Sequence, residues 1–332
     1  MRVLEYLLEV TKLKTIGIIT PGGDAPGMNA AIRAVVRIAH SRDCKIIGFE
    51  KGWYGLLTES KRHLTPRAVG GIVQSGGTML HTLRCLPFKT KEGIEKAANT
   101  LKSNNIESLI VIGGDGSFRG ALELSKKSGI QMIGIPATID NDVFGTDETI
   151  GFDTAVNTAI GTIDKIRDTA ISHERIFVVE VMGRKRGFLA LHVGIGVGAE
   201  VILIPEQKYD IKKIVHVLNT NSKKGKQTGI IVAAEGVGDT GELAKEIAKH
   251  TGSEVRLSIL GYAQRGGSPS GRSRLLASLF AEKAVDLMCN TKENHIVGLN
   301  NGKISSIPMN QSIGAQKSID PNMLQLAKQL SI

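Results

Sequence analysis

Short runs of Ile, Val and Leu alternate with helix-period segments along almost the whole of this 332-residue chain. The runs are continuously apolar, as expected for parallel strands that are buried on both faces of a sheet. This alternation predicts an α/β fold with two doubly wound, mostly parallel sheet lobes and helices on both faces. The predicted strands are residues 15–20, 45–49, 108–112, 131–135, 175–181, 201–204, 228–234, 256–260 and 295–299.

Capping residues mark several predicted helix starts. Thr65 and Asp320 each precede a proline, which is favoured in the first turn of a helix. Asp153 precedes a segment whose apolar residues share one helical face, at Val156, Ala159, Ile160, Ile163 and Ile166. Ligands of doubly wound folds bind beyond the carboxyl ends of the strands, so the motifs that follow the strands are the candidate site.

Net charge and the first residues limit the possible partners. Residues 1–14 are partly apolar, but Glu5 and Glu9 interrupt them, so we expect a short extension rather than a signal segment or a membrane span. The formal charge of +10 favours an anionic partner. Because the basic residues form no long run with interleaved aromatics, we expect phosphorylated metabolites held by scattered arginines, with no nucleic acid and no membrane.

The three cysteines, Cys44, Cys85 and Cys289, lie far apart and show no metal-binding spacing. This pattern favours a reducing compartment, and we expect a cytoplasmic protein. The length predicts two lobes, with a break near Gly151 where the motif-rich first part ends.

A glycine-rich turn, PGGDAPGMN at residues 21–29, follows the first predicted strand and precedes an Ala-rich helix. Glycines such as Gly23 let the backbone approach an anion, and the helix start offers unpaired N–H groups. An ordinary strand-to-helix turn has the same composition, so this turn alone leaves both interpretations open.

The segment GGDGS at residues 113–117 repeats this design and adds a carboxylate at the tip of a strand. Mg²⁺ prefers one or two carboxylates together with phosphate oxygens, so Asp115 is a candidate metal ligand. The alternative is that Asp115 only caps the helix that follows.

Two carboxylates, Asp140 and Asp142, lie in the segment PATIDND at residues 136–142, again just beyond a strand. One can take a proton from a hydroxyl group while the other orients it. Turns also favour Asp and Asn, so the segment is informative mainly because three such loops share one sheet edge.

Three arginines lie at strand ends in the second half: Arg184 and Arg265 stand beside glycines after strands, and Arg256 stands before residues 257–260. Arginine suits a bidentate grip on a sugar phosphate. Each of these arginines alone is more often a surface charge, and it is their shared position at strand ends that favours binding.

Taken together, these strings resemble the bacterial-type 6-phosphofructokinase family from residue 15 onward. The matching strings are PGGDAPGMNAAIR (21–33), GGDGS (113–117), PATIDND (136–142), TIGFDTA (149–155), VEVMGR (179–184), PE (205–206), AEG (234–236) and LGYAQRGGSP (260–269). The resemblance implies a kinase that moves the γ-phosphoryl group of ATP to the 1-hydroxyl of fructose 6-phosphate in glycolysis. It implies a nucleotide-binding lobe at residues 15–151 with about 264–314, and a sugar-phosphate lobe at 152–263 with about 315–332.

The resemblance also implies roles for individual residues. Asp140 would be the base, assisted by Asp142 and Thr138, while Arg84 and Arg184 would neutralise the moving phosphoryl group and Asp115 would hold Mg²⁺. The residues implied to bind ATP are Gly23, Arg84, Cys85, Phe88, Gly114, Asp115, Gly116 and Ser117. Those implied to bind the sugar phosphate are Thr138, Asp140, Asp142, Arg175, Met182, Gly183, Arg184, Glu235, Arg256, Tyr262 and Arg265.

Arg175 and Arg256 would reach the site of a neighbouring subunit, so the resemblance implies a homo-oligomer, with a tetramer expected. Tyr262 stands where many relatives have His, which puts the affinity for the sugar phosphate in question. The resemblance also implies allosteric regulation, because six residues match positions of the family's effector pocket: Arg33, Arg37, Arg167, Glu200, Lys224 and Lys226. Pro66 and Thr228 depart from the family pattern at that pocket, which argues against such regulation.

Gly116 and Ala137 favour ATP as the donor, because relatives that use pyrophosphate typically carry Asp and Lys there. The alternatives are a pyrophosphate-dependent enzyme, a kinase of another sugar phosphate, and a catalytically inactive regulatory homologue. A nucleic-acid-binding protein is a further alternative, which would bind with a steep dependence on salt.

Overall fold

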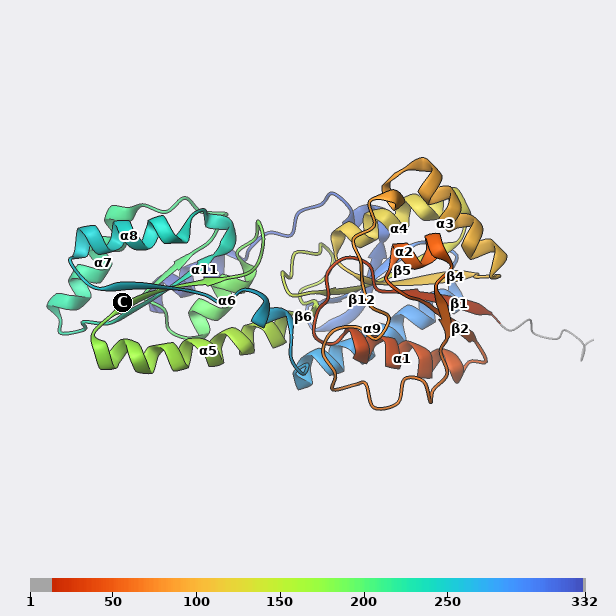
Figure 1. Cartoon of the computed structure of the whole chain (residues 1–332), viewed down its shortest axis with the longest axis horizontal. Coiled ribbons are helices and arrows are strands. Elements are labelled where there is room, and N and C mark those ends of the chain that lie inside the picture. Colours follow the sequence, from red (N-terminus) through yellow and green to blue (C-terminus); the bar gives the residue numbers. More distant parts are fainter. Residues whose placement is uncertain (1–13, 331–332) are drawn as a thin grey trace, which may run out of the picture.

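The computed structural model describes residues 14–330 of the chain. Its strands form two sheets in two lobes that lie side by side, and each sheet has helices on both faces (Figure 1). The prediction of two mostly parallel, doubly wound α/β lobes is confirmed. The predicted extension at residues 1–14 lies outside the described residues except for Lys14.

The larger sheet has the strand order β12-β11-β5-β4-β1-β2-β3, with β6 paired to β5. Its inner strands are parallel, whereas β3 and β12 pair antiparallel at the two edges. Its strands are β1 (Thr15–Ile19), β2 (Lys45–Phe49), β3 (Lys61–His63), β4 (Ser108–Gly113), β5 (Gln131–Thr138), β6 (Ile150–Gly151), β11 (His295–Asn300) and β12 (Lys303–Pro308).

Helices cover the two faces of this sheet (Figure 1). They bury alternate side chains of the strands. In β1, Ile16 and Ile18 join the core under one group of helices, whereas Ile19 joins the core under the other. The first group is α1 (Met28–His40) and α9 (Gly271–Asn290), and the second is α2 (Trp53–Thr58), α3 (Lys91–Ser103) and α4 (Asp115–Ser128). The period of two that a strand imposes therefore gives each face its own core.

The smaller sheet has the order β10-β7-β9-β8, and all its pairs are parallel. Its elements are α5 (Phe152–His173), β7 (Ile176–Val181), α6 (Phe188–Gly196), β8 (Val201–Leu203), α7 (Ile211–Lys223), β9 (Gly229–Ala234), α8 (Thr240–Thr251), β10 (Val255–Ile259) and α11 (Pro321–Leu330). Side chains of α7 and α8 pack on one face, and those of α5 and α6 pack on the other.

One hydrophobic cluster continues from the larger lobe into the smaller one. It includes Ile16 of β1 and Phe280 of α9, then Ile163 of α5, and finally Val179 of β7. The lobes therefore share buried side chains along the face that carries α1, α9, α5 and α6. Short connections cross the same seam, among them residues 313–320, which join α10 (Met309–Ser312) to α11.

Each of the nine predicted strands is present, and the ends differ by at most three residues. The sequence missed β3, β6 and β12, which are edge strands or only two residues long. Asp320 accepts a hydrogen bond from the backbone of Asn322 and begins α11 as predicted.

Two predicted helix starts are wrong. Thr65 accepts a hydrogen bond from the backbone of Ala68, but the chain makes only turns there, with no helix. Asp153 lies inside the first turn of α5, which begins one residue earlier after Gly151, where φ is 101°. Asp153 instead binds the hydroxyl of Ser270, so this carboxylate joins two helix starts.

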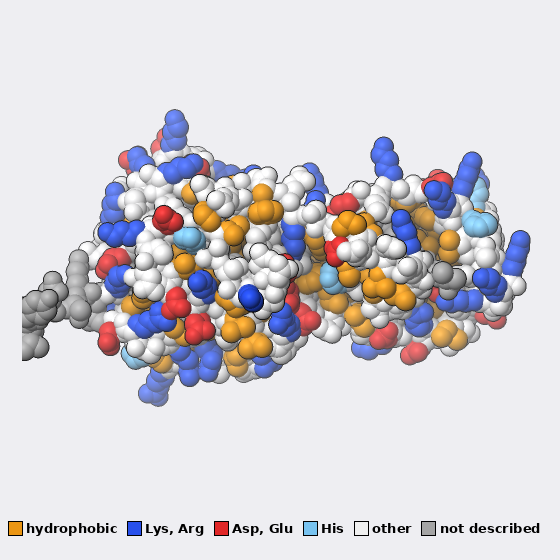
Figure 2. Space-filling model, turned by 180° about the vertical axis from the view of Figure 1, so that it is seen from behind, with side chains coloured by type: hydrophobic (Ala, Val, Ile, Leu, Met, Phe, Trp, Pro, Cys, Tyr) orange, Lys and Arg blue, Asp and Glu red, His pale blue; other side chains and the backbone are white. Residues whose placement is uncertain are grey.

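Lys and Arg side chains are spread over both lobes and interspersed with Asp and Glu on the face that Figure 2 shows. Within residues 14–330, no helix combines the length and the apolar composition needed to cross a membrane.

Candidate active site

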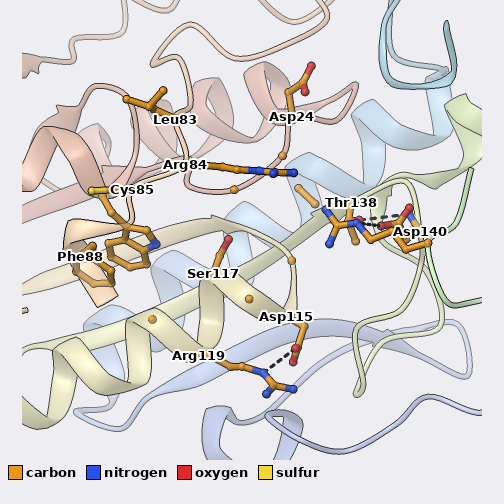
Figure 3. Close-up of a pocket in the computed structure, with 18 of the residues that line it drawn as sticks. Asp24, Leu83, Arg84, Cys85, Phe88, Asp115, Ser117, Arg119, Thr138 and Asp140 are labelled. Atoms are coloured by element: carbon orange, nitrogen blue, oxygen red, sulfur yellow. Dashed lines mark hydrogen bonds and ion pairs between the residues drawn. The ribbon is translucent and has the colours of Figure 1, made fainter. Parts of the chain in front are cut away.

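Loops from both lobes line a cleft of about 890 Å³ (Figure 3). Segments that follow β1, β4 and β5 form it from the larger lobe, and the segment that follows β7 completes it from the smaller one. Among its lining residues are Gly23, Arg84, Cys85, Phe88, Gly114, Asp115, Gly116, Ser117, Thr138, Asp140, Asp142, Met182, Arg184 and Arg265. The structure thus brings most of the predicted site residues together, while their individual roles stay predictions.

The two glycine-rich loops contact each other through Ser117. Its hydroxyl donates a hydrogen bond to the carbonyl of Pro21 at 2.8 Å. A Cβ on Gly113 would lie 2.6 Å from that hydroxyl and 2.9 Å from that carbonyl, so this strand end admits only glycine. Gly116, in contrast, would meet no atom within 4 Å, so a side chain there would enter open space. The first turn of α4 thus offers backbone N–H groups to an anion.

Asp115 is the first residue of α4 and does not cap it, because the N-cap position is Gly114. Its carboxylate pairs with Arg119 one turn later at 2.8 Å (Figure 3). The interpretation of Asp115 as a cap is therefore wrong. The Asp115 carboxylate is one-third exposed and lines the cleft. It is therefore accessible to a metal ion that also binds a phosphate in the cleft.

Asp140 is a buried carboxylate, only 4% exposed, at the end of β5. Burial raises the pKa of Asp140 to about 6, and the negative charge of Asp142 adds to the rise. The guanidinium of Arg184, whose Nε lies 3.3 Å from the Asp140 carboxylate, opposes it. A carboxylate with a pKa near neutrality and a cation at hydrogen-bonding distance is suited to accept a proton.

Burial also raises the pKa of Asp142, and the charge of Asp115 adds to this rise. Both Asp115 and Asp142 line the cleft. Thr138 is held beside Asp140, because its hydroxyl accepts a hydrogen bond from the backbone of Asp140 at 3.2 Å. Its own carbonyl accepts one from Thr149 at 2.6 Å.

Arg184 enters the cleft from the loop after β7, in a left-handed conformation with φ of 52°. The carboxylate of Glu235 fixes this conformation by accepting a hydrogen bond from the backbone N–H of Arg184 at 2.5 Å. Glu235 itself follows β9 and does not line the cleft, and Gly183 also lies outside the lining residues. The side chain of Arg184 is 65% exposed, and its guanidinium reaches the carboxylate of Asp140 at 3.3 Å.

Arg84 extends across the cleft toward Thr138 and Asp140 (Figure 3). The neighbouring Cys85 and Phe88 line the apolar end of the cleft. There the rings of Phe88 and Trp53 stack at 4.2 Å, and a Cβ on Gly120 would lie 3.1 Å from each ring. Trp53 was not predicted as a site residue, although it is the single tryptophan of the chain and Gly120 is an unusual residue inside a helix.

Arg265 lines the cleft where the two lobes meet. Its guanidinium pairs with the carboxylate of Asp24 at 2.9 Å and lies 5.8 Å from the ring centre of Tyr262. Tyr262 is 79% exposed and does not line the cleft.

Arg175 and Arg256 lie outside the cleft, toward the amino ends of β7 and β10. Both pair with Glu254 at the edge of the smaller sheet. The single chain does not bring them to the cleft, and their predicted role depends on a second chain.

A family model described as phosphofructokinase matches residues 15–288. The chain belongs to the phosphofructokinase family. An ATP-dependent 6-phosphofructokinase from Bacillus velezensis is 49% identical over 320 residues, which are 96% of this chain and 100% of that relative.

Solved structures of the family have the same fold. The T-state phosphofructokinase of Pichia pastoris superposes with a TM-score of 0.86 at 34% identity over 91% of this chain. This chain spans only 35% of the Pichia chain. The pyrophosphate-dependent phosphofructokinase of Marinobacter aquaeolei superposes with a TM-score of 0.82 over 96% of this chain and 92% of its own, but at 21% identity the likeness is one of fold alone.

Proposed function

We propose that this chain is an ATP-dependent 6-phosphofructokinase, which transfers the γ-phosphoryl group of ATP to the 1-hydroxyl of fructose 6-phosphate. The observation that carries the proposal is the buried Asp140, whose pKa burial raises to about 6, beside Arg184 at 3.3 Å in the cleft between the lobes. Relatives at 49% identity over their full length carry this name, which supports the same assignment here.

The larger lobe would hold ATP. The first turn of α4, with Gly114, Gly116 and Ser117, offers backbone donors to the phosphates, and Gly23 lies on the facing loop. The apolar end of the cleft, at Phe88 and Cys85, suits the base of a nucleotide. We therefore assign the nucleotide to residues 15–151 with about 264–314, and the sugar phosphate to 152–263 with about 315–332.

Asp140 would take the proton of the 1-hydroxyl while that oxygen bonds to the γ-phosphorus and ADP leaves. Asp142 and Thr138 would orient the hydroxyl, and the guanidinium groups of Arg84 and Arg184 would stabilise the charge on the equatorial phosphoryl oxygens. Met182, Gly183, Glu235, Tyr262 and Arg265 are the residues proposed to contact the sugar phosphate from this chain.

Asp115 fits a role in holding Mg²⁺. Mg²⁺ bound to nucleotide phosphates needs only one or two carboxylates, and Asp115 faces the cleft at the phosphate-binding helix start. When bound, the ion would neutralise charge on the donor phosphates. Arg119, which pairs with the Asp115 carboxylate, would have to release that carboxylate or share it with the ion.

A homo-oligomer, with a tetramer expected, would bring Arg175 and Arg256 to the site of a neighbouring subunit. Strand β10 is an edge strand whose Leu257 and Ile259 are exposed by 37% and 60%. Apolar side chains on an open strand edge favour burial against another chain. We place the reaction in the cytoplasm, where the free thiols of Cys44, Cys85 and Cys289 would stay reduced.

A coupled assay with fructose 6-phosphate and Mg²⁺, run with ATP or with pyrophosphate, tests the proposal. We expect turnover with ATP and little with pyrophosphate, because Gly116 leaves open space for the nucleotide. A preference for pyrophosphate would overturn the choice of donor, and no turnover with either donor would overturn the function.

A further inference from the structure

Lys317 lies where the two lobes meet, in the segment 313–320 that joins α10 to α11. Its ammonium donates a hydrogen bond to the backbone carbonyl of Asp147 at 2.9 Å and lies 5.0 Å from the ring centre of Phe188. Its own carbonyl accepts a hydrogen bond from Arg186. One residue thus contacts a loop of the larger lobe and the first turn of α6 in the smaller lobe.

The contact with Asp147 leads directly to the base. The same carbonyl of Asp147 also accepts a hydrogen bond from the side-chain amide of Asn141 at 3.1 Å. Asn141 is 2% exposed, stands between Asp140 and Asp142 in sequence, and holds a left-handed conformation with φ of 52°. The carbonyl of Asp147 therefore couples Lys317 to the loop that presents both carboxylates.

The contacts with Phe188 and Arg186 connect Lys317 to the segment that carries Arg184. Both residues belong to the segment that begins with Arg184 and continues into α6. The carboxylate of Glu206 fixes this segment by pairing with Arg186 at 3.3 Å and by accepting a hydrogen bond from the backbone of Gly187 at 3.1 Å. Lys317 thus joins a segment that is already fixed within the smaller lobe.

We propose that Lys317 is a positioning residue for phosphoryl transfer, which links the loop of Asp140 to the loop of Arg184 across the seam. Lys317 acts through Asp147 and Asn141 on one side and through Phe188 and Arg186 on the other, and does not touch the reacting groups. The inference rests on the proposed function, since it names what aligns the base with the arginine.

The positive charge of Lys317 contributes to the link between the two loops. Among the described residues, no carboxylate lies within 4.0 Å of its ammonium, so its fixed partners are a carbonyl and an aromatic ring. Burial lowers the pKa of Lys317 to about 8. Asp147, Asp142 and Glu148 counteract this shift, whereas Arg186 adds to it. On α6, burial lowers the pKa of His192 and the charge of Lys317 lowers it further.

The sign of the pH effect follows from these groups. As pH rises through about 8, Lys317 loses its proton and with it the attraction to the Phe188 ring. The two loops then loosen, so kcat falls on the alkaline side. Because Arg184 opposes the rise in the pKa of Asp140, a loosened Arg184 also lets that pKa rise further.

The test replaces Lys317 by Met, which keeps the stem and removes the charge. In Lys317→Met we expect kcat to fall by about 10- to 100-fold, as for a small misplacement of reacting groups. The midpoint of the acid limb, set by Asp140, should move to higher pH, and the alkaline limb near pH 8 should vanish. Lys317→Arg, which stays charged, should retain kcat while also losing the alkaline limb. Lys245→Met, on an exposed lysine of α8, is the control.

A second variant and a measurement without turnover keep the test decisive. Phe188→Leu keeps an apolar side chain but removes the ring that Lys317 contacts. If Lys317→Met fails to fold, Phe188→Leu should likewise move the midpoint of the acid limb to higher pH. Titration of Asp140 in protein with isotope-labelled aspartate, assigned with Asp140→Asn, reports its pKa directly. The inference is overturned if the pKa of Asp140 is unchanged in Lys317→Met, or in Phe188→Leu where Lys317→Met does not fold. A wild-type protein without phosphofructokinase activity would overturn the proposed function instead.

Discussion

The glycine-rich loops of the larger lobe meet the cleft with backbone, whereas the smaller lobe meets it with the side chains of Met182 and Arg184. On the larger lobe, Gly113 and Ser117 are packed so closely that the loop admits no other geometry. On the smaller lobe, Glu235 fixes the backbone of Arg184, while its 65% exposed side chain reaches Asp140 at 3.3 Å. A fixed cradle suits phosphates that stay in place, and an exposed cation on a long side chain suits a phosphoryl group that moves.

The largest expected effect lies where the two sides meet, at Asp140. Asp140→Asn removes the base but keeps its size, so kcat should fall by about 10²- to 10⁴-fold. The acid limb of the wild-type pH profile, near pH 6 because the carboxylate must lose its proton, should vanish as well. Steady-state rates across pH measure both, and Asp164→Asn, exposed on α5, is the control. Wild-type turnover in Asp140→Asn would reject Asp140 as the base.

Removal of the Arg184 guanidinium should lower kcat less than removal of the Asp140 carboxylate. In Arg184→Met the loss of one positioned donor should lower kcat by about 10²- to 10³-fold. The pKa of Asp140 should rise, because the positive charge that opposes its rise is gone. The neighbouring exposed Lys185→Met is a matched control. Equal losses in both variants would mean that net charge near the cleft matters and that the contact with Asp140 does not.

On the backbone side, a side chain at position 116 tests the open space at the start of α4. In Gly116→Asp the carboxylate would repel the nucleotide phosphates, so kcat/KM for ATP should fall by about 100-fold, the effect of a few kcal/mol. Gly116→Ala, which adds no charge where no atom lies within 4 Å, should be tolerated. Initial rates with ATP and with pyrophosphate measure the change, and an Asp variant that still prefers ATP at the wild-type rate would contradict the argument.

The smallest effect is expected at the apolar end of the cleft. Trp53→Leu removes the ring stacked on Phe88, and the loss of about 1 kcal/mol should raise KM for ATP by less than 10-fold. Because Trp53 is the single tryptophan, its fluorescence should change when ATP binds to the wild-type protein. Tyr54→Leu is the neighbouring control. If the fluorescence does not change when ATP is added, the nucleotide base does not bind beside Trp53.

The buried strands and the motif loops could be predicted because both follow from local pattern. Continuous apolar runs marked strands such as β4, the glycine-rich segment GGDGS marked Asp115, and a pair of carboxylates just beyond a strand marked Asp140. Strand β3, which reads Lys-Arg-His, has no apolar signal, because it pairs only at an exposed edge. Turn formation defeated the predicted helix at Thr65.

Contacts between distant segments lay beyond the reach of the sequence. Trp53 lines the cleft stacked on Phe88 from a distant part of the chain, and the pair Arg265 and Asp24 joins residues that are 241 positions apart. Lys317 stands in a stretch with no motif at all, and its importance follows only from the carbonyl that it shares with Asn141.

The cluster of buried side chains that runs from Ile16 and Phe280 through Ile163 to Val179 has a consequence for how the molecule comes apart. A fragment cut near Gly151 would leave an apolar wall facing water on each piece and would not persist as two independent proteins. Heating should therefore melt the chain in a single cooperative transition, with the catalytic seam lost at the same temperature as the sheets on either side.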